Sequence, residues 1–322
     1  MHVSFRRPLL MLVFTLLFFV SLSIGVSNVS LTHLLSWDAK SWHVILTSRL
    51  PRTIAIVLSA SGLSVAGLIM QSIGQNNFIS PSIIGSSDAA LLGVLVAFLW
   101  LGQAPMLIKL SLAFGFALVS SLIFMNLLQK IKLKDTIYVP LMGMMYGSII
   151  GALSTFIAHR FDALQVLSSI NLGSYANITS GRYELLWIII IPLLGAYVYA
   201  SAFSLARLGS DFAINLGVNY KRIVLIGLII VAIVAAATYV IVGPLPFVGL
   251  VIPNIISMLY GDNLKRSILD LILFGSIYVL FNDILSRLII FPYEISVSFM
   301  MGITGSLIFI YLILKRGRYA QT

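Results

Sequence analysis

The chain has 322 residues, of which 60% are hydrophobic and only 9% carry a charge. Soluble domains have about 25% charged residues, so this composition excludes a soluble fold. The absence of cysteine excludes disulfides, thiol catalysis and cysteine metal sites. The net charge of +10 would suit a nucleic-acid partner, but the basic residues are scattered at the ends of apolar stretches, as in membrane proteins. The sequence therefore predicts an integral membrane protein without a nucleic-acid partner.

Long apolar stretches follow one another along the chain. A bilayer-spanning helix needs roughly 20 apolar residues, and these stretches are too continuous for the strands of a membrane barrel. Helices then satisfy the backbone in lipid, so an all-α polytopic membrane protein is expected. About ten spans fit one transmembrane domain of residues 1–322. They are expected at about 9–26, 51–72, 83–101, 107–128, 136–157, 184–206, 223–242, 250–260, 267–290 and 295–314.

The first apolar run follows Arg6 and Arg7 and has two interpretations. It could be a cleaved signal peptide. However, the run is long, and Ser27-Asn28-Val29 does not match the small-residue cleavage pattern, so a retained first helix is favoured. The following polar segment, with Trp37 and Trp42, suits the outer membrane interface.

The positive-inside rule gives the orientation of the predicted spans. With the N-terminus inside, thirteen basic residues fall inside and seven outside. The inside ones are Arg6, Arg7, Lys130, Lys132, Lys134, Arg207, Lys221, Arg222, Lys265, Arg266, Lys315, Arg316 and Arg318. The outside ones are Lys40, Arg49, Arg52, Lys109, Arg160, Arg182 and Arg287. This bias predicts that both termini are cytoplasmic.

Three of the outside arginines, Arg49, Arg52 and Arg287, lie at the outer ends of predicted spans. Their side chains could extend to the interface, and Asp283 could pair with Arg287 at i,i+4 along one helix. Alternatively, the three form an outward positive ring that docks an acidic soluble partner. Spacing alone favours the first interpretation.

Small and acidic residues within spans also have two interpretations. Gly143, Gly147 and Gly151 recur every four residues, which leaves one helix face nearly bare. Close helix packing explains this pattern better than the smooth wall of a translocation path. Asp88 and Asp270 lie near the inner starts of the third and ninth spans, where each is expected in a first helical turn. An ion-coupled transporter would show carboxylates deeper in the membrane.

The polar segment 207–222 is expected to form a short cytoplasmic helix, with Asp211 as a possible cap and Gly217 as a stop. The chain has no G-x-x-x-x-G-K-[ST] phosphate loop and no H-E-x-x-H motif. No catalytic residue, bound cofactor or metal site is therefore expected. Transport against a gradient would therefore need energy from another chain. A small helix on a cytoplasmic loop is a place where such a chain could bind and transmit movement.

Several segments resemble the iron-siderophore and vitamin B12 ABC importer permeases, the FecCD or BtuC-like family. The matching stretches keep the order and spacing of the family nearly end to end. They are Arg49-Leu50-Pro51-Arg52-Thr53, Gly67-Leu68-Ile69-Met70-Gln71, residues 76–85, Leu208-Gly209, Ala213, Leu216-Gly217-Val218, Gly243-Pro244, Phe247 to Pro253, Asp283, Arg287 and Glu294.

The resemblance implies a type II ABC importer permease with ten helices per subunit. It also implies a second permease subunit, a cytoplasmic ATPase dimer that uses ATP and Mg²⁺, and an extracellular substrate-binding protein.

By the same resemblance, the residues expected to dock the binding protein are Arg49, Arg52 and Arg287. Those expected at the cytoplasmic gate are Asn76 and Phe78. Those expected along the translocation path are Gly143, Gly147 and Gly151. Those expected to couple to the ATPase are Gly209, Ser210, Asp211, Ala213, Leu216 and Gly217.

Three positions depart from the family pattern. Ser210 stands where Glu is frequent, Asn77 replaces the usual Pro of the gate loop, and Asn254 replaces the His that usually follows Val-Ile-Pro. The gate-loop version Asn77-Phe78-Ile79-Ser80-Pro81 is most similar to the catechol-type siderophore permeases, which commonly pair with a different permease. A heterodimer is therefore favoured over a homodimer.

The sequence thus predicts a multi-pass permease subunit that moves ferric siderophore across the cytoplasmic membrane of a bacterium. A permease for cobalamin or haem in the same family is the main alternative. An ion-coupled secondary transporter is disfavoured by the sparse midplane carboxylates. A membrane scaffold without transport activity would not explain glycines at every fourth position beside polar breaks.

Overall fold

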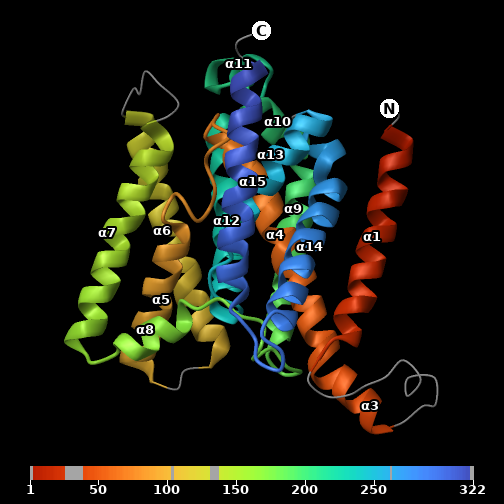
Figure 1. Cartoon of the computed structure of the whole chain (residues 1–322). Helices are drawn as coiled ribbons and strands as arrows, with labels where there is room; N and C mark the ends of the chain where they lie inside the picture. The colour runs from red at the N-terminus through yellow and green to blue at the C-terminus, as the bar shows by residue number, and fades with distance from the viewer. Residues whose placement is uncertain (1–2, 26–38, 103–104, 131–137, 262, 320–322) are drawn as a thin grey trace.

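The structure is a computed structural model that describes residues 3–25, 39–102, 105–130, 138–261 and 263–319. This described part of the chain is all-helical, as the composition predicts, and forms one bundle (Figure 1). The predicted basic loop with Lys132 and Lys134, and Trp37 of the predicted interfacial segment, lie outside the described residues.

The helices follow in the order α1 (Val3–Ser23), α3 (Ala39–Val44), α4 (Leu50–Ile73), α5 (Ser86–Leu101), α6 (Met106–Lys130), α7 (Tyr138–Arg160), α8 (Leu164–Ile170), α9 (Ile190–Val198), α10 (Ala200–Ala206), α11 (Ser210–Asn215), α12 (Tyr220–Ile241), α13 (Val248–Tyr260), α14 (Leu264–Leu288) and α15 (Val297–Tyr319). A π-helical turn, Ile45–Arg49, leads into α4, and a 3-10 segment, Tyr183–Ile189, leads into α9.

The two ends of the bundle differ. α1 begins and α15 ends at the end where α11 lies, which we call the inner end (Figure 1). The opposite end, where α3 lies, is called the outer end.

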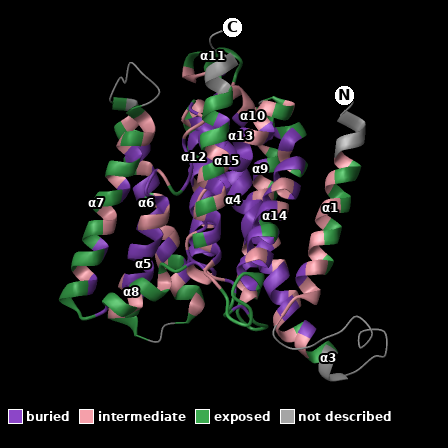
Figure 2. Cartoon of the chain, in the orientation of Figure 1, coloured by how far each residue is buried: buried purple, intermediate pink, exposed green. Residues whose placement is uncertain are grey.

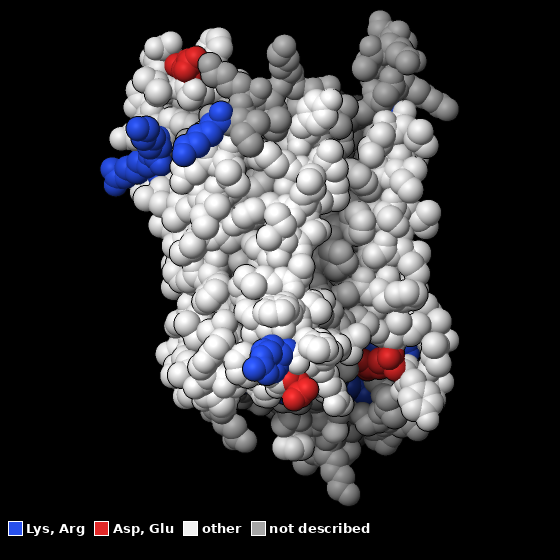
Figure 3. Space-filling model, turned by 90° about the vertical axis from the view of Figure 1, so that its left-hand side faces the viewer, with Lys and Arg blue, Asp and Glu red and all other residues white. Residues whose placement is uncertain are grey.

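Among the described residues, six helical segments are long and apolar enough to cross a membrane: Trp42–Ile73, which includes α4, and the helices α6, α7, α12, α14 and α15. The segment from Tyr183 to Ala206, bent by 65° between α9 and α10, makes a seventh if it counts as one span. α1, α5 and α13 contribute shorter apolar helices. On the face shown in Figure 3, charged side chains lie toward the two ends, and the belt between them shows none. The bundle is therefore that of a multi-pass membrane protein.

α4 is the core helix. It packs against α12, α13 and α14, and nearly all of its residues are buried (Figure 2). Its buried side chains include Ser59, Ser64 and Gln71, whose polar groups form hydrogen bonds inside the bundle, and such groups are unfavourable against lipid, which suits a central place. In α7 and α15, in contrast, only 22% and 28% of the residues of the apolar span are buried.

Glycines bring α4 and α13 into backbone contact. A Cβ added to Gly67 would lie 2.0 Å from the carbonyl oxygen of Gly249. A Cβ added to Gly249 would lie 3.1 Å from the carbonyl oxygen of Leu63. Small residues allow membrane helices to approach this closely. The contact fixes the beginning of α13 against the middle of α4.

α5 and α13 both begin inside the bundle after an irregular link. The link 74–85 precedes α5, and the link 242–247 precedes α13. Each link ends in a left-handed residue, Gly85 with φ 75° and Phe247 with φ 67°. α5 then runs toward the outer end and α13 toward the inner end (Figure 1). The two halves of the bundle thus contain the same helix–link–short-helix unit in opposite directions.

The depth of the first link follows from its contact with α6. The hydroxyl of Ser86, the first residue of α5, lies 2.7 Å from the hydroxyl of Ser121. Ser121 precedes the inner end of α6, Lys130, by nine residues, or roughly 14 Å at 1.5 Å per residue. α5 therefore begins well inside the apolar belt.

Candidate functional site

The small helix α11 stands at the inner end of the bundle (Figure 1). Gly209, with φ 103°, precedes it, and Gly217, with φ 82°, follows its last turn. The amide of Val218 donates to the carbonyl oxygen of Ala213 at 3.0 Å, so Gly217 forms the left-handed stop that a Schellman-type helix end requires. Ala213 is buried against the bundle and anchors the helix.

Large apolar side chains in α11 and in the residue that follows it are exposed. Phe212, Ile214 and Leu216 are 66%, 59% and 59% exposed. The polar side chains of Ser210 and Asp211 contact each other, with Ser210 Oγ donating to Asp211 Oδ1 at 3.1 Å. Phe212 and Leu216, four positions apart, lie on the same side of this short helical segment and form an exposed apolar surface that a soluble partner can cover.

The predicted gate residues lie in the link 74–85, close to the inner end. Asn76 is buried, and its Oδ1 accepts a hydrogen bond from the amide of Phe78 at 2.8 Å. The ring of Phe78 meets Phe309 of α15 edge to face, with centroids 5.9 Å apart. Phe309 also contacts Phe247, at 6.4 Å between centroids. An aromatic cluster thus joins the first link, α15 and the second link.

Asn77 connects this link to the segment before α11. Arg207 donates a hydrogen bond from Nη2 to the side-chain oxygen of Asn77. Asn254 of α13 donates from Nδ2 to the backbone oxygen of Asn77 at 2.7 Å and to Leu250 O at 2.7 Å. The sequence marked Asn77 and Asn254 only as departures from the family pattern. Their contact spans 177 positions of sequence, so no local signal could reveal it.

A second contact brings the same two segments together. Gly209 lies beside Gln75, such that an added Cβ would be 3.6 Å from Oε1 of Gln75. Tyr220, the first residue of α12, donates from its hydroxyl to Ile73 O at 3.3 Å. The residues just before and just after α11 therefore both touch the region where α4 ends and the first link begins.

The glycines of α7 divide between two environments. A Cβ on Gly143 would lie 2.8 Å from Ile83 O, and a Cβ on Gly147 would lie 2.7 Å from the carboxylate of Asp88. Gly151 has open space beside it. Close packing against the end of the first link and the start of α5 therefore accounts for two of the three glycines.

The three outer arginines converge, but they are engaged within the chain. Arg52 donates from Nε and Nη2 to Asp283 Oδ1 at 3.1 and 2.7 Å, and from Nη1 to both carboxylate oxygens of Glu294 at 2.9 Å. Arg287 donates from Nη2 to Asp283 Oδ2 at 2.5 Å, which is the i,i+4 pair expected from spacing. Arg49, Arg52 and Arg287 are only 5%, 8% and 5% exposed.

Two of these arginines also hold the end of α1. Arg49 donates to the carbonyl oxygens of Leu22 and Ser23, both at 2.9 Å. Arg287 donates to Ser21 O at 3.0 Å and to Ile24 O at 2.9 Å. Cations near the last carbonyls of a helix are favourable, so the outer end of α1 is fixed to the rest of the bundle.

The inner acids differ from each other. Asp88 lies in the first turn of α5, as expected. Asp270 does not lie in a first turn, because α14 begins at Leu264. Its buried carboxylate instead accepts hydrogen bonds from Arg7 of α1 at 3.2 and 3.0 Å. The sequence assigned Asp270 wrongly, since its partner is 263 positions away.

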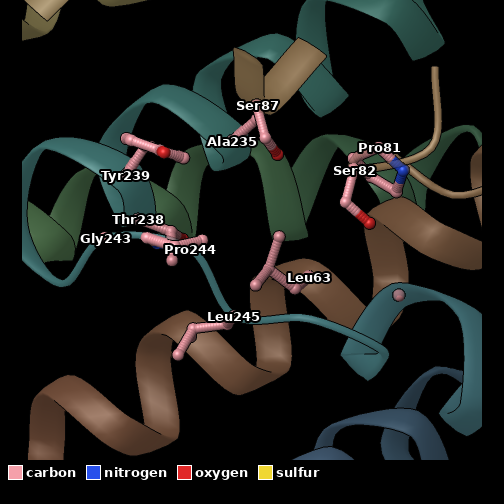
Figure 4. A pocket seen from close by; sticks show the side chains of 11 residues that line it. Leu63, Pro81, Ser82, Ser87, Ala235, Thr238, Tyr239, Gly243, Pro244 and Leu245 are labelled. Atoms are coloured by element: carbon pink, nitrogen blue, oxygen red, sulfur yellow. The ribbon is translucent and has the colours of Figure 1, made fainter. Parts of the chain in front are cut away.

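A small cavity lies where the two links meet (Figure 4). Hydroxyls of Ser82, Ser87 and Thr238 line it together with Pro81 and Pro244. No charged side chain lines it, and no group of three or more His, Asp or Glu that could hold a metal ion occurs among the described residues. This cavity therefore offers no charged side chain to an ion or a charged chelate.

The fold has long apolar helices that cross the membrane and two links that lie between them. Together with the exposed apolar side chains at α11, it defines the class of membrane permeases that have a contact surface for a soluble partner. The model of the FecCD transport family matches residues 11–315. A petrobactin import system permease protein of Bacillus subtilis (strain 168), YclN, is 47% identical over 300 residues, which cover 93% of this chain and 95% of that protein.

A ferric-anguibactin transport system permease protein of Vibrio anguillarum, FatD, is 36% identical over 306 residues, 95% of this chain and 98% of that protein. The solved structure of a metal-chelate type ABC transporter in an inward-facing conformation has a TM-score of 0.81 at 23% identity, covering 95% of this chain and 97% of that one. The chain belongs to the FecCD transport family. It is a transporter permease subunit and not an enzyme.

Proposed function

We propose that this chain is the membrane-spanning subunit of an ABC importer that carries a ferric siderophore across the bacterial cytoplasmic membrane. The relatives at 47% and 36% identity are permeases for petrobactin and ferric anguibactin, which supports a siderophore as the substrate. The observation that carries the mechanism is the exposed apolar helix α11 beside the Arg207–Asn77 hydrogen bond.

The proposed topology has ten spans with both termini in the cytoplasm. The six long spans, the bent pair and the three shorter helices α1, α5 and α13 sum to ten. α1 begins at the end where α11 lies, and the charge bias puts that end in the cytoplasm (Figure 1).

The proposed partners follow from this topology. A cytoplasmic ATPase dimer binds ATP and Mg²⁺ and contacts Phe212, Ile214 and Leu216, which α11 leaves exposed. A second permease, a different chain rather than a second copy, covers the sides of α7 and α15 that are not buried in the bundle. An extracellular binding protein delivers the siderophore at the outer end, where the arginine cluster lies. This chain itself binds no cofactor in the proposal.

In the proposed mechanism, ATP-driven closure of the ATPase moves α11. The movement passes through Arg207 to Asn77, and from Asn77 through Asn254 to α13. The displaced link moves Phe78 against Phe309, so the inner gate opens and closes between the first link and α15.

Reconstituted uptake tests the proposal. The permease is placed in proteoliposomes with its partner permease, ATPase and binding protein, and each component is omitted in turn. Uptake of labelled ferric siderophore should need every component and ATP. Uptake without the ATPase, driven by an ion gradient, would contradict the proposal. If the reconstituted transporter takes up haem or cobalamin in preference to ferric siderophore, the chain is a haem or cobalamin permease of the same family instead.

A further inference from the structure

Two cations predicted to lie outside, Lys109 and Arg182, have no part in the proposed function. Both line one cavity of about 510 Å³ at the outer end of the bundle. Its walls come from α5, α6, α8, the segment 172–182 and the end of α12. The volume lies within the roughly 300–1,000 Å³ typical of small-molecule sites.

The cavity has an excess of positive charge. Its lining contains no Asp or Glu, and within the described part of the chain neither Lys109 nor Arg182 takes part in an ion pair. Arg182 makes one long hydrogen bond, from Nη1 to Asn177 O at 3.5 Å. Glu184, which is close in sequence, instead accepts a hydrogen bond from the amide of Gly181 at 2.7 Å. Two cations therefore share a cavity without a described counter-charge.

The rest of the lining has two characters. Val94 and Phe98 of α5 and Met106 of α6 form an apolar wall, and Phe98 is 39% exposed. Ser169 of α8 and Ser174 add hydroxyls. A ligand that satisfies the whole cavity must carry an oxyanion for the cations and a hydrocarbon part for the wall.

We propose that this cavity binds the headgroup of an anionic membrane lipid. Lys109 and Arg182 contact the phosphate oxygens, the hydroxyls contact the glycerol part, and the first acyl carbons lie against Val94 and Phe98. Lysine and arginine bind phosphate oxygens through charge-assisted hydrogen bonds, which are stronger than neutral ones. The lipid neutralises the outer end beside α8. The inference does not depend on which substrate is transported.

Native mass spectrometry of the purified chain in neutral detergent tests the inference, with phosphatidylglycerol, phosphatidylcholine and inorganic phosphate as separate probes. The wild type should bind phosphatidylglycerol in preference to phosphatidylcholine. Lys109→Gln with Arg182→Gln should weaken phosphatidylglycerol binding by about tenfold or more, because two charge-assisted contacts are lost. Lys109→Arg with Arg182→Lys should retain it.

Arg160→Gln is the matched control, since Arg160 is an exposed outer arginine at the end of α7 that does not line the cavity. It should bind phosphatidylglycerol like the wild type, and a melting curve without lipid checks that each variant is folded. Equal phosphatidylglycerol binding by the double Gln variant, or equal binding of phosphatidylcholine by the wild type, would overturn the inference. Binding of inorganic phosphate as tight as that of the lipid would also overturn it, because the apolar wall would then contribute nothing.

Discussion

Arg207 donates a hydrogen bond to the side chain of Asn77, and so ties the segment before α11 to the link between α4 and α5. Arg207 follows the last residue of α10 and lies three positions before α11 begins. Asn77 is flanked by the two predicted gate residues. A displacement of α11 by a soluble partner must therefore either move the link or break this contact.

The contact between Gly67 and Gly249 predicts a large effect of a single methyl group. Gly67→Ala would place Cβ 2.0 Å from a backbone oxygen that cannot rotate away. Overpacking costs about 1–3 kcal/mol, so the melting temperature in detergent should fall by several degrees. Gly115→Ala is the control, because Gly115 lies in α6 with nothing within 4 Å of an added Cβ. Equal melting temperatures for both variants would refute the backbone contact.

The buried arginine cluster predicts that Asp283 is a stability residue. Asp283 is fully buried and forms ion pairs with both Arg52 and Arg287. Asp283→Asn removes the negative charge that the two arginines share. Breaking a buried ion pair costs about 3–5 kcal/mol. Thermal unfolding should show a loss of this order, whereas Asp162→Asn, at an exposed outer position, should change little. A loss no larger than that of the control would show that the cluster is not important for stability.

Substituting Glu294 tests docking more directly than replacing the arginines by Glu, because the arginine substitutions would break the buried cluster itself. Its side chain is 26% exposed and occupies Nη1 of Arg52. If an acidic binding protein docks on Arg52, Glu294 competes with it. Glu294→Gln should then raise the affinity of the labelled binding protein a few-fold, and Glu184→Gln should not. An unchanged or lower affinity would count against docking at Arg52.

Gly217 should be required for the left-handed helix end that directs the chain from α11 into α12. Gly217→Val places a β-branched residue at φ 82°, where such side chains are strained. We expect loss of ATPase binding in pull-down assays with the permease still folded. Gly261→Val tests strain alone, since Gly261 has φ 75° and open space but follows α13 rather than α11. Retained ATPase binding in Gly217→Val would contradict the role of α11.

The sequence predicts the class of fold well because apolar length and charge bias are local properties. It identifies the link around Asn76 and the helix around Asp211 as polar breaks. It cannot pair Asp270 with Arg7 or Asn77 with Asn254, because those contacts join segments far apart in the chain. The outer arginines illustrate the same limit, since their positions are visible in the sequence but their burial and internal carboxylate partners are not.

Coupling through Asn77 is tested most directly by measuring siderophore uptake and ATP hydrolysis together in proteoliposomes. Asn77→Ala removes the acceptor used by Arg207 but keeps the backbone oxygen used by Asn254. Asn126→Ala is the control, because Asn126 is an exposed residue of α6 whose side chain makes no hydrogen bond to a described residue. We predict that Asn77→Ala hydrolyses ATP but imports several-fold less siderophore per ATP, while Asn126→Ala matches the wild type. The same number of siderophores per ATP in Asn77→Ala and the wild type would contradict the account.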